Sequence, residues 1–101
     1  MKTIEHFVNG KIYSGSSEKL SSVFNPATGE ETAKVKLGVS KDLDYAVEKA
    51  HEAFKDWSNT PPLQRARVLF KFKELIEKNE DELTKIIVSE HGKVYEDAKG
   101  S

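Results

Sequence analysis

Residues 61–78 carry more apolar side chains than one face of a helix can bury. Pro61 and Pro62 open the segment, and proline in the first turn loses no helical hydrogen bond, so we predict a helix that runs to about Lys78. Its apolar side chains cover most sides: Leu63, Ala66, Val68, Leu69, Phe70, Phe72, Leu75 and Ile76. A surface helix needs only a stripe about 100° wide. This helix is therefore expected to be buried on more than one side, and a chain of 101 residues has little left to cover it.

Two further helices are predicted, one on each side of this segment. The earlier helix has apolar residues spaced three and four apart on one clean face: Leu43, Ala46, Val47, Ala50, Phe54 and Trp57. We expect Ser40 or Asp42 to cap it, and Thr60 to cap the middle helix. The later helix continues the apolar stripe: Leu83, Ile86 and Ile87. A capping box of Asn79 and Glu82 is predicted at its start, and a left-handed Gly92 at its end.

Strand and turn signals fill the first 39 residues. Residues 5–8 and 11–14 flank Asn9-Gly10, the strongest short-range hairpin signal, because both residues tolerate the positive φ of a type I′ turn. A strand over residues 20–24, a turn over 25–29 and an alternating strand over 31–37 follow. The predicted fold class is α+β: antiparallel hairpins, then three helices. We expect residues 1–39 and 40–101 to form one partial domain.

Composition excludes several classes of function. The net charge is -1, which gives no bulk attraction to nucleic acid or to anionic lipid. The chain has no cysteine, so a disulfide framework, a thiolate zinc site and a cysteine nucleophile are excluded within it. No apolar run approaches the roughly 20 residues that span a bilayer, and the first residues lack the apolar stretch of a secretory signal. We expect a protein of the cytoplasm.

Three sets of residues suggest chemistry, and each has a simpler explanation. His6, His51 and His91 lack metal-ligand spacing, and His91-Gly92 is typical of a helix end. Four basic residues interleave with phenylalanines as in a nucleic-acid or membrane stripe: Arg65, Arg67, Lys71 and Lys73. Helical geometry scatters these charges around the helix, which favours solvated edges of a buried face. The acidic residues 30–31 and 80–82 lack apolar surroundings that would raise a pKa for acid–base catalysis.

Several segments, taken in order, resemble the amino-terminal region of the aldehyde dehydrogenase family. They are residues 7–11 (FVNGK), 25–30 (NPATGE), the helix positions of 42–58, 65–70 (RARVLF) and 90–93 (EHGK). Residues 60–62 (TPP), 89–93 (SEHGK) and 97–100 (DAKG) are similar to the methylmalonate-semialdehyde dehydrogenase branch. Most other members carry threonine or a similar residue where His91 stands. The family usually has an acidic residue after the DAKG position, where this chain has Ser101.

The resemblance implies a reaction that this chain does not perform alone. Intact members bind NAD on a doubly wound parallel sheet, and a cysteine thiolate attacks the aldehyde. In this branch the acyl group is then released to coenzyme A. The resemblance also places the catalytic cysteine, the oxyanion asparagine, the carboxylate base and the coenzyme-binding glycines in later parts of full-length members. We therefore expect no catalytic, cofactor-binding or metal-binding residue here.

We expect an amino-terminal, non-catalytic fragment of an NAD-dependent aldehyde dehydrogenase. Its expected partner is the remainder of the dehydrogenase chain, or a second copy that docks through the apolar helix face around Leu69, Phe70, Phe72 and Ile76. Nucleic acid and membrane are not expected partners. The alternative is an independent helical interaction module without enzymatic activity. A small enzyme in its own right has almost no support, because the chain shows no nucleophile, metal or cofactor signal.

Overall fold

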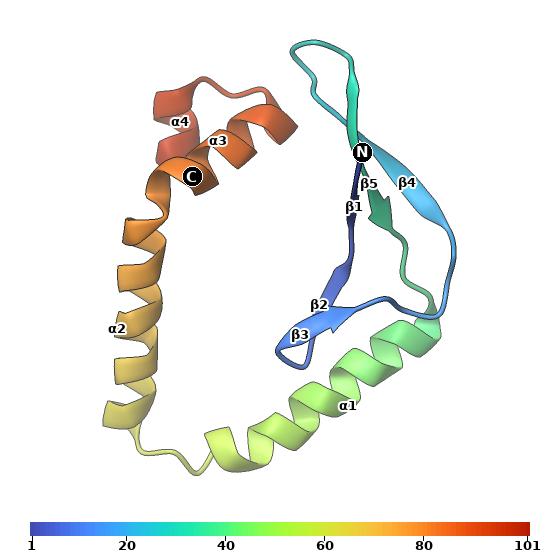
Figure 1. The fold of residues 1–101 in the computed structure, drawn as a ribbon. Coiled ribbons are helices and arrows are strands. Elements are labelled where there is room, and N and C mark those ends of the chain that lie inside the picture. Colours follow the sequence, from blue (N-terminus) through green and yellow to red (C-terminus); the bar gives the residue numbers. More distant parts are fainter. The chain divides into compact units, whose positions relative to one another are not determined.

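The computed structural model describes residues 1–101 and has an α+β fold of five strands and four helices (Figure 1). The strands are β1 (Lys2–Ile4), β2 (His6–Val8), β3 (Lys11–Tyr13), β4 (Leu20–Phe24) and β5 (Glu31–Lys36). The helices are α1 (Ser40–Trp57), α2 (Pro62–Lys78), α3 (Glu80–His91) and α4 (Tyr95–Lys99). Two compact units form: Met1–Val23 with Glu31–Asn59, and Phe24–Glu30 with Thr60–Ser101. The predicted α+β class is confirmed.

The predicted hairpin is present in the first unit. Strands β2 and β3 pair antiparallel, with Phe7 opposite Ile12. Asn9 and Gly10 have φ of 57° and 74°, the two positive values that a type I′ turn requires. Phe7 and Ile12 are 74% and 72% exposed, so the outer face of this hairpin is uncovered.

A second sheet has the strand order β1-β5-β4. Backbone bonds from Asn25 N to Glu30 O (2.9 Å) and from Leu37 N to Lys19 O (3.0 Å) close the two ends of the β4–β5 hairpin. Strand β1 pairs in parallel with β5, and no local signal predicted this strand, because a parallel partner lies far away in the sequence. The alternation along β5 buries Ala33 to 6% exposure.

Helix α1 begins at Ser40, and its N-cap residue is Val39. The prediction that Ser40 or Asp42 is the cap is therefore wrong. Asp42 occupies the third helical position, and its carboxylate reaches back to accept a hydrogen bond from Val39 N (3.0 Å). The helix starts one residue early because this carboxylate satisfies the free amide from inside the first turn.

Of the two other predicted caps, Thr60 is wrong and Asn79 is confirmed in position only. Pro61, in extended conformation, is the N-cap of α2, so Thr60 is not the cap residue. Asn79 does stand at the N-cap of α3, but its backbone is close to helical and its amide Nδ2 donates to Leu75 O (2.7 Å). The side chain thus closes the end of α2, and the predicted box with Glu82 does not form.

In the second unit, α3 ends as predicted at Gly92, and a helix that was not predicted follows it. Gly92 has a φ of 81°, and a Cβ there would lie 2.9 Å from Pro26 Cγ, so the turn over residues 25–29 packs closely on the end of α3. Three helices were expected and four are found. Helix α4 has five residues, too few for periodicity to reveal, and Ala98 holds it against α3 at 1% exposure.

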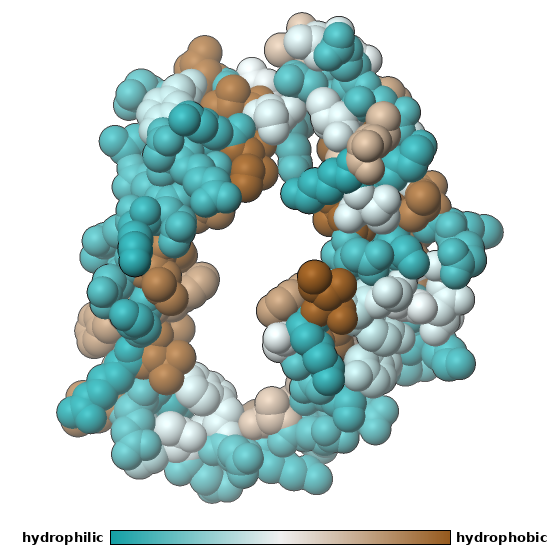
Figure 2. Space-filling view, viewed as in Figure 1, coloured by the Kyte–Doolittle hydropathy of each residue, from teal (hydrophilic) through white to brown (hydrophobic).

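Very little apolar surface is buried in either unit. Ala33 and Ala98 are the buried hydrophobic residues, and no large side chain is fully buried. Helix α2 has no buried residue at all. Figure 2 shows brown apolar surface along α2 among the teal charged residues. The expectation that α2 exceeds what the chain can cover agrees with these exposures. None of the helices combines the length and apolar character needed to cross a bilayer.

Candidate functional site

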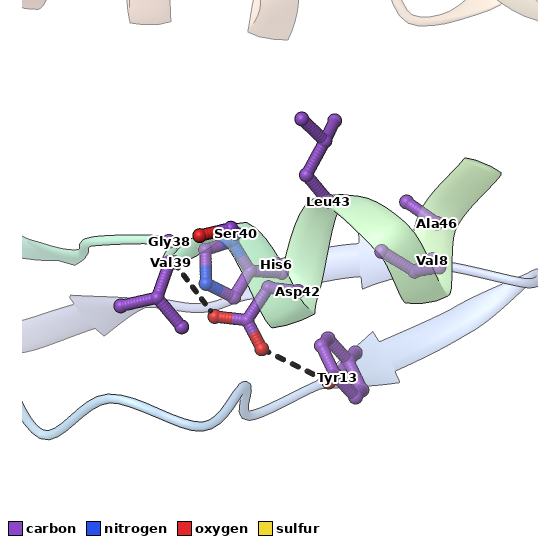
Figure 3. A pocket seen from close by; sticks show the side chains of 9 residues that line it. All are labelled: His6, Val8, Tyr13, Gly38, Val39, Ser40, Asp42, Leu43 and Ala46. Atoms are coloured by element: carbon purple, nitrogen blue, oxygen red, sulfur yellow. Dashed lines mark hydrogen bonds between the residues drawn. The ribbon is translucent and has the colours of Figure 1, made fainter.

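An open pocket of about 420 Å³ lies in the first unit, between the β2–β3 hairpin and the start of α1 (Figure 3). Its polar lining comes from His6 of β2, Tyr13 of β3, and Ser40 and Asp42 of α1. Val8, Leu43 and Ala46 supply its apolar wall. The polar residues converge because the Asn9-Gly10 turn returns Tyr13 beside His6, opposite the first turn of α1.

The Asp42 carboxylate is the centre of this pocket. It is 6% exposed and accepts three hydrogen bonds: from Val39 N (3.0 Å), from Tyr13 Oη–H (3.0 Å) and from Ser16 N (2.9 Å). The amide of Val39, foremost, and then the Tyr13 hydroxyl and the Ser16 amide lower the pKa of Asp42 below its ordinary value, against the opposing effect of burial. The group is therefore ionised at neutral pH, and its oxygens are already bound.

Tyr13 joins the hairpin to α1 in two ways. Its ring stacks on Tyr45 with centroids 4.7 Å apart and an interplanar angle of 14°, while its hydroxyl donates to Asp42. Burial, and then the bond to Asp42, raise the pKa of Tyr13. A phenol with a raised pKa holds its proton at neutral pH, so the pair works as a fixed link rather than as an acid–base couple.

Gly15 makes the close packing of this cluster possible. Its φ is +79°, and a Cβ there would lie 3.1 Å from His6 Cδ2 and 3.3 Å from Asp42 Oδ2. His6 Nε2 is buried and has no hydrogen-bond partner. The imidazole thus fills space beside Gly15 and Gly38.

The pocket does not fit the dinucleotide that the resemblance implies. The connection from β5 to α1, through Gly38, is the chain's one passage from strand to helix. A pyrophosphate binds at such a junction through free amides and the positive end of the helix. Here the Asp42 carboxylate already holds the Val39 amide, and its negative charge would repel a phosphate.

The three histidines that the sequence singled out lie on three different elements. His6 is on β2, His51 is on α1 beside Phe54 (ring centroids 6.5 Å), and His91 is the last residue of α3. No group of three histidine, aspartate or glutamate side chains is arranged to hold a metal ion.

Three of the five acidic residues that the sequence singled out pair with lysines: Glu31, Glu80 and Asp81. Glu31 pairs with Lys34 (2.7 Å), and this bond is the main cause that lowers the pKa of Glu31. Asp81 pairs with Lys85 (3.0 Å) and accepts from Tyr95 Oη–H (2.8 Å); the lysine, foremost, lowers the pKa of Asp81. A lowered pKa keeps a carboxyl ionised, which is the opposite of what a general acid needs.

The basic residues of α2 do not gather into one patch. Arg65 donates from Nε to Thr60 O (3.0 Å), Lys71 lies 3.6 Å from Glu74, and Lys73 pairs with Glu77.

The Asp42 cluster was not predicted as a site, because Tyr13 and Asp42 are 29 residues apart. The polar run over residues 14–18, which contains the glycine that admits the cluster, was the available signal.

Comparisons with known proteins give one consistent result. Residues 12–101 match the aldehyde dehydrogenase family. The malonate-semialdehyde dehydrogenase of Pseudomonas aeruginosa is 46% identical over 100 residues, which are 99% of this chain and 20% of that protein. A methylmalonate-semialdehyde dehydrogenase of Oceanimonas doudoroffii superposes with a TM-score of 0.94 at 46% identity, over 99% of this chain and 20% of that one.

A second solved structure carries a coenzyme. It is a Sinorhizobium meliloti protein assigned as a methylmalonate-semialdehyde dehydrogenase, in complex with NAD, and it superposes with a TM-score of 0.95 at 45% identity. It too is matched over 99% of this chain and 20% of its own length. This chain therefore spans about a fifth of the relatives it matches.

Proposed function

This chain belongs to the aldehyde dehydrogenase family and corresponds to the amino-terminal part of its coenzyme-binding domain, and from that premise we propose that it acts as a non-catalytic structural part of a semialdehyde dehydrogenase. The single observation that supports this role is the uncovered α2, which has no buried residue although it is apolar on most sides. Such a helix suits the interior of a larger protein. Residues 1–39 and 40–101 would together form one partial domain of it.

The reaction proposed for the intact enzyme is oxidation of a malonate-type semialdehyde in the cytoplasm. NAD would accept the hydride and coenzyme A the acyl group. This chain would supply no catalytic, cofactor-binding or metal-binding residue, because its most enclosed carboxylate is already held by three donors. Its contribution is to fix α1 on the hairpin through Asp42 and Tyr13 and to present α2 to the remaining chain. A second copy of the chain is the other occupant of that face, which would make the protein an oligomer.

Segment exchange tests this proposal directly. In the Pseudomonas aeruginosa malonate-semialdehyde dehydrogenase, the matching 100 residues would be replaced by this chain. Because the catalytic and coenzyme groups would come from the host, we expect NADH formation at no less than about a tenth of the host rate, a barrier change of at most ~1.4 kcal/mol. The host without this segment is the control and should not fold. A soluble, correctly sized exchange enzyme without activity would contradict the proposal, as would NAD reduction by this chain alone.

An independent interaction module is the second candidate, favoured by the same exposed side chains of α2. The two candidates differ in solution. An incomplete domain should self-associate and bind an apolar dye through its uncovered surface. Size-exclusion chromatography with light scattering distinguishes them, because a strict monomer at high concentration with no dye binding would favour the independent module.

A further inference from the structure

Five exposed apolar residues form a continuous stripe along α2. They are spaced one, four, seven and eight positions from the first member, the pattern of one helix side: Val68, Leu69, Phe72, Leu75 and Ile76. Their exposures lie between 42% and 60%. A groove of about 470 Å³ follows the stripe and is lined by Val68, Phe72 and Leu75 together with Arg67 and Lys71. We call these five apolar residues the α2 stripe.

The charged residues nearest the edges of the α2 stripe are lysines. Lys71 and Lys78, seven residues apart, lie along one edge, and Lys73 lies along the other. The acids of this helix, Glu74 and Glu77, fall on the opposite side. They pair with Lys71 and Lys73 around the helix, but all four side chains are more than half exposed. Exposed pairs of this kind contribute ~0–1 kcal/mol, so the lysines can turn toward a partner.

We propose that the α2 stripe docks an amphipathic helix whose own apolar stripe is edged by aspartate and glutamate. This inference rests on the proposed function, because it assigns that helix to the remaining part of the dehydrogenase chain. Apolar ridges packed into the groove would exclude water. Acidic edges would then meet Lys71 and Lys78 on one side and Lys73 on the other, where unlike charges select the partner and its register.

The charges argue against the two other occupants. A second copy that pairs α2 with α2 would bring lysine edges together, and like charges facing one another are unfavourable. An anionic membrane surface needs a helix that is apolar on one side and basic on the other. The side of α2 opposite the stripe carries Leu63 and Phe70, which are 63% and 68% exposed, together with the two glutamates. Such a helix would leave apolar groups in water when it lay on lipid.

Two synthetic helical peptides of about 18 residues provide the probe. They share a leucine stripe, and one is edged by glutamate while the other is edged by lysine. Fluorescence anisotropy with the 101-residue chain should show the glutamate-edged peptide binding at least tenfold tighter, or about 1.4 kcal/mol. Added salt should reduce the difference in affinity between the two peptides, because screening weakens charge pairs. Phosphatidylserine vesicles serve as a third ligand and should bind more weakly than this peptide.

Charge reversal supplies the matched variants. The triple change Lys71→Glu, Lys73→Glu and Lys78→Glu should invert the preference toward the lysine-edged peptide. The control reverses three exposed lysines away from α2 by Lys11→Glu, Lys41→Glu and Lys55→Glu, and should leave the preference unchanged. Circular dichroism confirms that each variant keeps its helices. Because every variant is compared with itself on two peptides, partial loss of structure lowers both affinities without inverting them.

The following results would overturn the inference: equal binding of both peptides, an unchanged preference after charge reversal, a homodimer that pairs α2 with α2 in place of peptide complexes, or binding to vesicles alone. None of them would count against the proposed function, which segment exchange measures through NADH formation. Conversely, an inactive exchange enzyme together with a clear peptide preference would retain the docking face and reject the dehydrogenase role.

Discussion

Helices α1 and α2 are nearly equal in length, 18 and 17 residues, but only α1 is joined to the strands through a buried side chain, Asp42. The start of α1 is joined to the β2–β3 hairpin by a buried carboxylate with three donors and by the stacked pair Tyr13 and Tyr45. Helix α2 has no buried residue, and its apolar side chains lie on two sides. Polar contacts within the chain anchor α1, whereas α2 needs contacts from protein outside this chain.

The difference follows from the kind of partner each helix needs. A carboxylate at the first turn needs only a few nearby amides and hydroxyls, and the polar run over residues 14–18 supplies one of them. Burial of five large apolar residues needs a facing apolar surface, which a small chain lacks. The same sequence therefore contains a complete polar contact between α1 and the hairpin, and an apolar packing surface on α2 that the chain leaves uncovered.

The largest effect is expected at Phe72 in two different contexts. In the exchange enzyme, Phe72→Ala should lower the free energy of unfolding by about 3–5 kcal/mol, the usual cost of removing a buried phenylalanine. In the 101-residue chain, where Phe72 is 59% exposed, the change should be no more than about 0.5 kcal/mol. Denaturant unfolding of both proteins gives the two values. Equal losses in both contexts would remove the contrast between α1 and α2.

Asp42→Ala should have the next largest effect, because it leaves the Val39 and Ser16 amides and the Tyr13 hydroxyl without their acceptor. We expect the Tm of the chain to fall by roughly 10 °C. Asp44→Ala is the matched control, an exposed aspartate two residues further along α1, and should shift Tm by less than about 2 °C. Equal Tm shifts would mean that the hydrogen bonds of Asp42 stabilise the chain no more than an exposed aspartate does.

Gly92→Ala sharpens the comparison within the second unit. A left-handed residue with a Cβ costs about 1–2 kcal/mol, and here the Cβ would also meet Pro26 Cγ at 2.9 Å. Gly29→Ala is the control, since its φ of +75° carries the same backbone cost with nothing within 4 Å. Urea unfolding should therefore show a larger loss at Gly92. The same loss at both positions would exclude close packing of the turn on α3.

The pH dependence of stability should be the smallest effect. The pKa of Asp42 is lowered by folding, so its contribution is complete above the unfolded value of 3.8 and is lost as pH falls through the folded value. The pKa of Tyr13 is raised, so its contribution is present below 10.0 and is lost at higher pH. Asp42→Asn should flatten the acid limb of the Tm profile. Glu31 and Asp81, whose pKa values are also lowered, should preserve part of it.

Local residues predicted the local parts of the fold. Asn9-Gly10 specified the hairpin, Gly92 specified a helix end, and the length of α2 followed from Pro62 and from the polar residues after Ile76. Each of these signals consists of one residue or a few neighbouring residues, so backbone preferences alone determine the local structure.

Features that depend on distant residues could not be predicted in this way. Tyr13 binds Asp42 across 29 residues, β1 pairs with β5 in the β1-β5-β4 sheet, and Tyr95 of α4 binds Asp81 of α3. The hydrogen bonds of the cap residues could not be predicted for a related reason. The side chains of Asp42 and Asn79 can each bond to several free backbone groups, and only the three-dimensional arrangement determines which group is nearest.

Hydrogen exchange of backbone amides, residue by residue, tests most directly whether α2 lacks its cover. In the 101-residue chain at monomeric concentration, we predict protection in the first turns of α1 and little in α2, because a helix with few buried contacts opens locally. In the exchange enzyme, both helices should be protected. Amides of α2 as protected as those of α1 in the lone monomer would contradict the account.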